Sequence, residues 1–222
     1  MSGGSSTVGE LSPRPAGADI GGRMPPTRQP TKDSFGAQLR AQQCEQAWAM
    51  DEGRFGLKVW LRRRWCPRGV RPPWLVDDRY EWLWVYGAVE PASGASVFLF
   101  LPGVDTACLQ IFLDVLAQEV AARRVGLVLD GSGAHHAARL RWPESLVPLW
   151  LPPYSPELNP AEQLFRYLRA QLANRLFADL AELEAAITAV LRAFWDQPPI
   201  LRRLTAYPWW LQATHDIMPA AS

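Results

Sequence analysis

Three acidic side chains stand where the sequence could use them for chemistry. Asp51 lies in the apolar stretch "WAMDEGRF". Asp130 ends the apolar run "VGLVLD", and the small residues "GSG" that come next would let a substrate backbone come close. Glu162 begins a predicted helix directly after "LPPYSPELNP", in which four prolines fall within ten residues. These carboxylates can act together only if the fold brings them to one place.

Each carboxylate also has a purely structural interpretation. Asp130 could cap a following helix, and Asp51 could be an edge-strand residue that faces water. For Glu162, Asn159 is a good N-cap and Pro160 suits the first helical position, so Glu162 falls where a capping-box carboxylate would. Glu162 could also pair with the arginine one turn further along the helix. The local sequence leaves these alternatives open.

Taken together, the three carboxylates predict a metal site. A cluster of acidic oxygens is unfavourable unless a cation neutralises it, and hard oxygen ligands select Mg²⁺ or Mn²⁺. Two such ions about 4 Å apart can activate a water and stabilise the leaving oxygen of a phosphodiester. The prolines fix φ at four positions and could aim the helix start at the strand ends, although a rigid turn that serves only packing would look similar.

Composition favours one intracellular domain of good size. The chain has 222 residues, of which 48% are hydrophobic and 11 are Trp, enough for a substantial core. A formal net charge of +1 excludes a global basic field, so any nucleic-acid site must be a local patch. Cys44, Cys66 and Cys108 form no CxxC pair, which argues against zinc and disulfides and fits a reducing cytoplasm. We find no secretory segment and no membrane-spanning run.

The order of the expected elements predicts an α/β layered domain with a mixed sheet. Residues 1–43 are rich in Gly, Ser and Pro and are expected to form a disordered leader that turns helical near 34–46, with one domain over 44–222. Hydrophobic patterns then predict two strands in 47–61 joined by a turn at Gly53, a hairpin from 80–91 and 95–102, a helix at 105–124, strands at 125–130 and 146–152, and helices at 160–175 and 179–195.

Four segments in this order resemble the catalytic domain of DDE transposases, in the bacterial insertion-sequence branch of the mariner superfamily. They are "MDEGRFGL", "RRRWCPRGVRP", "LVLDGSGAHHA" and "LPPYSPELNPAEQLFRYLR", and the resemblance covers roughly residues 45–212. It implies a ribonuclease-H-like fold, a mixed five-stranded sheet flanked by helices. It also implies that Asp51, Asp130 and Glu162 are the catalytic residues and bind two Mg²⁺ or Mn²⁺ ions.

The resemblance implies a transposase that cuts transposon ends and joins the 3′-hydroxyl to target DNA, typically at a TA dinucleotide. It implies a homodimer acting on double-stranded DNA in the bacterial cytoplasm, associated with the nucleoid when bound. Full-length relatives carry helix-turn-helix domains before the catalytic domain, and residues 1–43 cannot hold one. That module is expected from a separate or frameshifted reading frame, unless the chain is a truncated remnant. The alternatives are a non-transposing metal-dependent nuclease of the same fold and a catalytically silent remnant.

Further contacts with DNA are expected from basic side chains. A loop interleaved with Trp65 suits phosphate contacts, or is an ordinary solvated turn; its arginines are Arg62, Arg63, Arg64, Arg68 and Arg71. Arg166 and Arg169 share a face of the helix after Glu162, either to hold the DNA backbone or as solvated surface. His135 matches a family histidine that would contact substrate or metal-bound water, or be structural. Gly131 stands where the family commonly has Asn.

Overall fold

The computed structural model describes residues 32, 34–63, 65–69, 77–121, 123–131, 139–215 and 217. Within these ranges, no helix is both long enough and apolar enough to cross a membrane.

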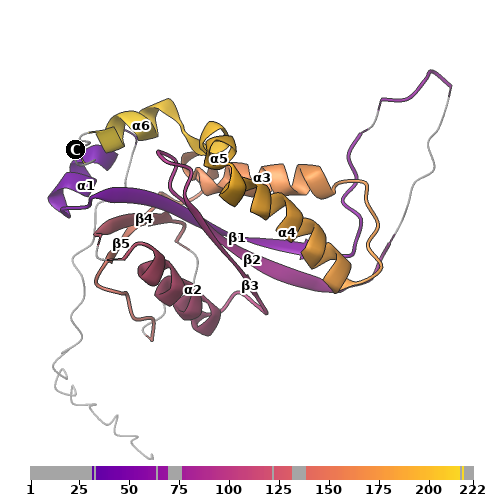
Figure 1. Ribbon diagram of the computed structural model, residues 1–222, viewed down its shortest axis with the longest axis horizontal. Coiled ribbons are helices and arrows are strands. Elements are labelled where there is room, and N and C mark those ends of the chain that lie inside the picture. Colours follow the sequence, from indigo (N-terminus) through magenta and orange to yellow (C-terminus); the bar gives the residue numbers. More distant parts are fainter. Residues whose placement is uncertain are drawn as a thin grey trace, which may run out of the picture.

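A mixed five-stranded sheet runs through the centre of this part of the chain, in the order β3-β2-β1-β4-β5 (Figure 1). The strand β2 pairs antiparallel with both β1 and β3, whereas β4 lies parallel to both β1 and β5. The bounds are β1 (Gln46–Gly56), β2 (Trp82–Val89), β3 (Ser96–Leu101), β4 (Val125–Leu129) and β5 (Leu146–Trp150). The predicted mixed sheet is therefore confirmed, as are the hairpin and the short apolar strand before Asp130.

Helices cover both faces of the sheet (Figure 1). One face carries α2 (Thr106–Glu119), and the other carries α3 (Ala161–Leu172), α4 (Leu180–Asp196) and α5 (Pro198–Thr205). A short 3₁₀ turn (Pro156–Leu158) leads into α3. The sequence patterns predict α2, α3 and α4 but neither α5 nor α6 (Pro208–His215).

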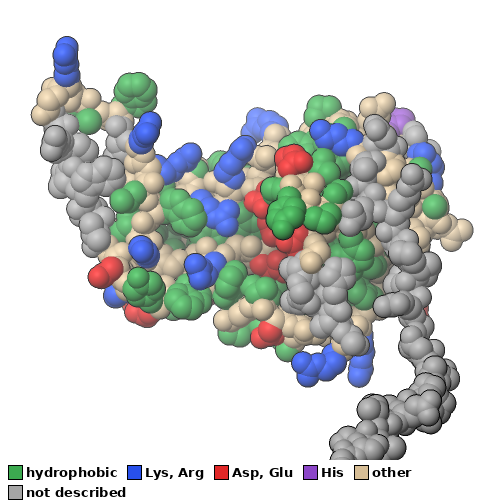
Figure 2. All heavy atoms as spheres, turned by 180° about the vertical axis from the view of Figure 1, so that it is seen from behind, with side chains coloured by type: hydrophobic (Ala, Val, Ile, Leu, Met, Phe, Trp, Pro, Cys, Tyr) green, Lys and Arg blue, Asp and Glu red, His purple; other side chains and the backbone are tan. Residues whose placement is uncertain are grey.

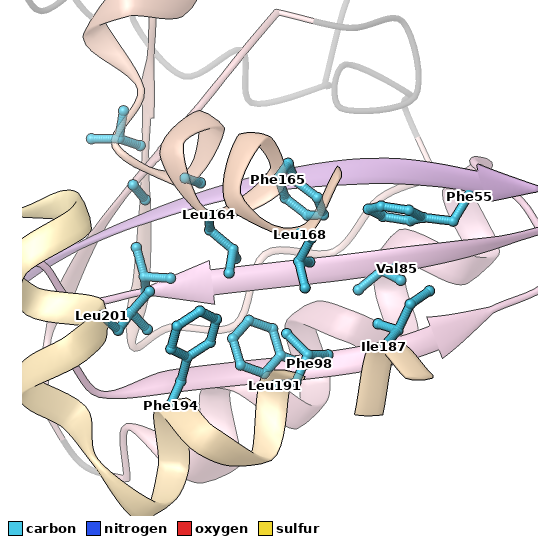
Figure 3. Close-up of a cluster of buried hydrophobic side chains, with 14 of the residues drawn as sticks. Phe55, Val85, Phe98, Leu164, Phe165, Leu168, Ile187, Leu191, Phe194 and Leu201 are labelled. Carbon is cyan, nitrogen blue, oxygen red and sulfur yellow. The ribbon is translucent and has the colours of Figure 1, made fainter. Parts of the chain in front are cut away.

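Alternation along β1 divides its side chains between two cores. Ala49 and Phe55 belong to the core under α3 and α4, whereas Trp48 and Met50 belong to the core under α2. Figure 3 shows the first core, in which Phe165 of α3 lies over the sheet near Phe55, their ring centroids 6.4 Å apart. Each face of β1 thus packs against a different layer of helices.

The strand β1 is continuous, so the prediction of two strands joined by a turn at Gly53 is wrong. Gly53 pairs with Val85 of β2 in the middle of the ladder. A Cβ atom added at Gly53 would lie 2.6 Å from Cε1 of Phe165 and closer still to Cδ1, nearer than atoms can pack. The glycine therefore allows α3 to approach β1 closely and does not break the strand.

The folded region begins before the predicted boundary at residue 44. The helix α1 (Phe35–Ala41) lies inside the predicted leader, and Phe35 and Leu39 are fully buried. The ring of Phe35 packs on Trp209 and Trp210, with centroids 5.6 and 4.6 Å away. The predicted helix near 34–46 is confirmed as a helix. The domain starts earlier than residue 44, because two apolar side chains anchor α1 to the core. Residues 1–31 lie outside the described residues.

We expect Gly53→Ala to lower the free energy of unfolding by about 1–3 kcal/mol, because the new methyl group overpacks the buried ring of Phe165. Urea denaturation monitored by tryptophan fluorescence measures this change. Gly103→Ala is the matched control, since its Cβ would meet only Asp105, at 3.7 Å. Equal stability of the two variants would contradict the close approach.

Candidate active site

Two of the three predicted carboxylates lie on the same face of the sheet. Ala49 of β1 pairs with Val128 of β4, and both side chains belong to the core under α3. Asp51 and Asp130 each come two residues later, so alternation returns both to the face that carries α3. Strand register, continued past the Ala49–Val128 pair, therefore places Asp130, directly after β4, beside the middle of β1 where Asp51 lies.

Asn159 ties the start of α3 to the backbone directly before Asp51. Among the described residues, β1 pairs only with β2 beyond Ala49, so its other edge is open there. Asn159 is 3% exposed; its Nδ2 donates to the carbonyl oxygen of Met50 at 2.9 Å, and its Oδ1 accepts from the Ala161 N–H at 3.0 Å. One buried amide thus joins two elements that are far apart in the sequence.

Glu162 is carried on the first turn of α3, close to these strands. Asn159 supplies the capping oxygen that the sequence predicts, but Glu162 does not complete a capping box. Within the described part of the chain, its carboxylate forms no hydrogen bond and no ion pair with Arg166. The two structural alternatives for Glu162 are therefore not observed.

The carboxyl group of Asp51 is strongly perturbed by its surroundings. Burial, the charge of Glu162, the adjacent Glu52 and then Asp130 raise its pKa from the ordinary 3.8 to about 8. A hydrogen bond of 2.8 Å, donated by the Glu52 N–H to Oδ1, opposes this rise in pKa only in part. The charges of both other predicted carboxylates therefore contribute to the raised pKa of Asp51. The space-filling view shows acidic side chains gathered near the middle of one face (Figure 2).

The residues at this site fit a divalent cation in type. Their ligand atoms are carboxylate oxygens, which Mg²⁺ and Mn²⁺ prefer. Among the described residues, no group of three His, Cys, Asp or Glu side chains is arranged to hold a metal ion. The described carboxylates therefore lie within electrostatic reach of one another but not at coordinating positions.

The predicted DNA-binding arginines fall into two groups. Arg62, Arg63 and Arg68 are exposed in the arm, defined here as the described residues 57–63, 65–69 and 77–81, which projects beyond β1 and β2 (Figure 1). Arg166 is exposed on α3, while Arg169 is half-buried. The guanidinium of Arg169 lies 5.8 Å from the ring of Phe55 and 5.5 Å from that of Trp60.

The arm and α3 are fastened together, a feature that sequence patterns did not reveal. Asn174, two residues past α3, donates its N–H to the Trp60 carbonyl at 2.8 Å and accepts the Arg62 N–H at 3.0 Å. At the other root of the arm, Arg79 donates to the carbonyl oxygens of Phe177 and Ala178 at 2.8 and 2.7 Å. No local pattern reports such contacts, because each joins positions about a hundred residues apart.

Three predicted site residues lie outside the described residues: Arg64, Arg71 and His135. Their assignments stay predictions.

The fold class is ribonuclease-H-like, shared with the Mos1 transposase. Its mariner paired-end complex with Mn has a TM-score of 0.54 at 15% identity over 92% of this chain and 68% of that chain. The paired-end complex with Mg has a TM-score of 0.53 at 18% identity, and the strand transfer complex 0.52 at 15%, with the same coverage.

The chain belongs to the DDE superfamily endonucleases, whose family model matches residues 46–184. It is also 36% identical over 120 residues to the uncharacterized protein y4pE/y4sA of Sinorhizobium fredii, over 53% of this chain and 88% of that protein. The resemblance to a DDE transposase catalytic domain is therefore confirmed. Its placement in the bacterial insertion-sequence branch stays a prediction.

We expect Asp51→Asn to stabilise the metal-free protein, by more at pH 8 than at pH 5. The folded protein holds a proton on Asp51 that the unfolded chain releases, so stability falls as pH rises from 3.8 towards about 8. Asparagine removes this loss and keeps the oxygen that accepts the Glu52 N–H.

Urea denaturation in EDTA at the two pH values measures the effect of Asp51→Asn. Asp78→Asn, at an exposed carboxylate, is the control. A stability difference between Asp51→Asn and the native protein that does not change with pH would contradict the raised pKa.

We expect Asn159→Ala to lower the free energy of unfolding by about 1–3 kcal/mol, because it leaves the buried Met50 carbonyl without its donor. Hydrogen exchange should also become faster at the Ala161 N–H and in the first turn of α3. Asn174→Ala removes a more exposed amide and should leave that turn protected. Unchanged exchange at Ala161 in Asn159→Ala would show that Asn159 does not hold the helix start.

Proposed function

We propose that this chain is the catalytic part of a DDE transposase, with Asp51, Asp130 and Glu162 as its metal-binding catalytic residues. The observation that carries the proposal is the perturbed carboxyl of Asp51, whose pKa is raised by burial and by the charges of Glu162 and Asp130. Desolvated carboxylates that repel one another destabilise a fold, and their oxygens are the ligands that a divalent cation needs. This arrangement therefore favours a cation site over a structural role.

Together, the three carboxylates would bind two Mg²⁺ or Mn²⁺ ions. Bound ions supply an activated water and stabilise the leaving oxygen of the phosphodiester. The chain supplies placement: β1 and β4 fix Asp51 and Asp130, and Asn159 fixes the helix that carries Glu162. Cutting at a transposon end frees a 3′-hydroxyl, which the same residues would orient for attack on target DNA.

Arginines on α3 and on the arm would hold the DNA backbone beside this site. Arg62, Arg63, Arg68 and Arg166 are exposed, and guanidinium groups form strong hydrogen bonds with phosphate. Asn174 fastens the root of the arm to the end of α3, so the backbone of Arg62 keeps a fixed relation to that helix. Arg64, Arg71 and His135 are proposed DNA contacts on the sequence resemblance alone.

The proposed setting is a bacterial insertion sequence of the mariner superfamily, with the protein in the cytoplasm and on the nucleoid. We propose a homodimer that brings two transposon ends together and inserts at TA. A helix-turn-helix module from a separate or frameshifted reading frame would recognise the ends. The Mos1 relatives support this assembly, since they were solved as paired-end and strand transfer complexes.

We expect Asp130→Asn to abolish nicking of supercoiled plasmid DNA in Mn²⁺, because the amide cannot replace an anionic metal ligand. Agarose gels that separate supercoiled from relaxed circles measure nicking, and circular dichroism checks that the variant is folded. Asp114→Asn, at an exposed carboxylate of α2 on the other face of the sheet, should nick as the native protein does. Undiminished nicking by Asp130→Asn would end the proposal.

A joining assay separates the proposed transposase from the two alternatives. A pre-nicked duplex carrying the terminal repeat of the element should become covalently joined to target plasmid. A nuclease of the same fold would hydrolyse DNA without joining it. A silent remnant would do neither, and would show no Mn²⁺ binding in isothermal titration calorimetry.

A further inference from the structure

An open strand edge leads away from the carboxylates. Beyond Ala49, the described part of β1 pairs only with β2, so the edge from Asp51 to Gly56 has no strand beside it. At the beginning of this edge, the Asn159 side chain donates a hydrogen bond to the Met50 carbonyl oxygen. The rest of this edge runs from the proposed metal site towards the root of the arm (Figure 1).

Two stacks of arginine on aromatic rings lie along this part of β1, one on each face of the sheet, and the stack on the α2 face extends over β2. On the α3 face, Arg169 lies 5.5 Å from the ring of Trp60, which is 51% exposed. On the α2 face, Arg54 lies 5.4 Å from Trp82, which is 46% exposed, and 6.0 Å from Trp84. Figure 2 shows Lys, Arg and hydrophobic side chains intermixed between the acidic cluster and the projecting arm.

The charges of these stacks are not compensated within the described chain. Neither Arg54 nor Arg169 forms an ion pair there, and Nε of Arg169 is buried without a hydrogen-bond partner. Lys58 adds a third cation, 5.6 Å from the ring of the exposed Tyr80. A surface of half-exposed rings and cations, without ion pairs among the described residues, therefore lies along β1 beyond the carboxylates.

We propose that this surface, formed by Arg54, Trp60, Trp82 and Arg169, binds an unpaired DNA strand that leads away from the carboxylate site. Cations alone would suffice for a duplex, which presents phosphates on its outside and keeps its base faces stacked inside. Exposed rings gain a partner only when bases are unpaired and can stack on them. Rings held by stacked guanidinium groups are already fixed in place, so binding orders them at little entropic cost.

The inference rests on the proposed function, since it makes this strand part of the substrate. It adds that DNA is opened beside the site of cutting and that the opened strand is held by stacking. A second copy of the chain could also cover rings and arginines of this kind. Uncompensated positive charge next to a site for phosphodiesters favours DNA.

The test compares a blunt duplex with the same duplex frayed at one end by a few mismatches. Fluorescence anisotropy in EDTA, where no cutting occurs, measures binding of both by the full chain. We expect tighter binding of the frayed duplex. Trp60→Leu and Trp82→Leu should each weaken binding of the frayed duplex by about tenfold and affect the blunt duplex less. Trp60→Phe keeps a ring and should retain the preference.

Trp195→Leu is the matched control. Trp195 is also 51% exposed, but it packs on the ring of Phe98 at 5.8 Å and lies on α4, away from the open edge. Equal losses in Trp195→Leu and Trp60→Leu, or no preference in the native protein, would overturn the inference. If Trp60→Leu and Trp82→Leu change only the oligomeric state, measured by sedimentation, the surface contacts a second copy of the chain. That result would also overturn the inference.

Nicking by the native protein in Mn²⁺ is measured in a separate experiment from binding of the frayed duplex. Nicking without a preference for frayed DNA would refute only the strand-binding surface. A preference abolished by Trp60→Leu, in a native protein that does not nick, would support the surface and refute the proposed chemistry.

Discussion

Repulsion between the half-buried carboxylates of Asp51 and Glu162 is the constraint that the rest of this fold must oppose. The charge of Glu162 on α3 disfavours ionised Asp51 on β1, so the two elements gain by moving apart. The Asn159 amide holds them together through backbone groups, not through the carboxylates. The close approach of Phe165 to Gly53 holds them a second time. Neither contact uses a carboxylate oxygen of Asp51 or Glu162.

The stiff segment before α3 delivers Asn159 to this position. Prolines at fixed φ leave the unfolded chain fewer conformations to lose, so ordering the segment costs less. The segment also holds Tyr154 at φ 58°, in the left-handed region that a bulky residue rarely adopts, with its side chain fully exposed. Such a conformation persists only when the surrounding structure fixes it. Rigidity here serves the placement of one buried amide and, through it, of Glu162.

Features with a local signal in the sequence were predictable, whereas features that depend on distant contacts were not. The strand β4 is predictable from the apolar run before Asp130, and the start of α3 from its Asn-Pro pair. Burial and helix capping both leave local signals in the sequence. Gly53 looked like a turn because its reason to be glycine, the ring of Phe165, lies more than a hundred residues away. The capping role of Asn159 was predictable, but its bond to Met50 was not, since no local pattern specifies that partner.

The helix α3 links the proposed metal site to the proposed DNA contacts. Its first turn is held to β1 by Asn159, and just past its last turn Asn174 holds the root of the arm. Arg79 fastens the returning side of the arm to the same connection between α3 and α4. A shift of α3 along the sheet would therefore move Glu162 and the arm together. Coupling of this kind needs no separate signal between the sites, because one rigid helix carries both ends.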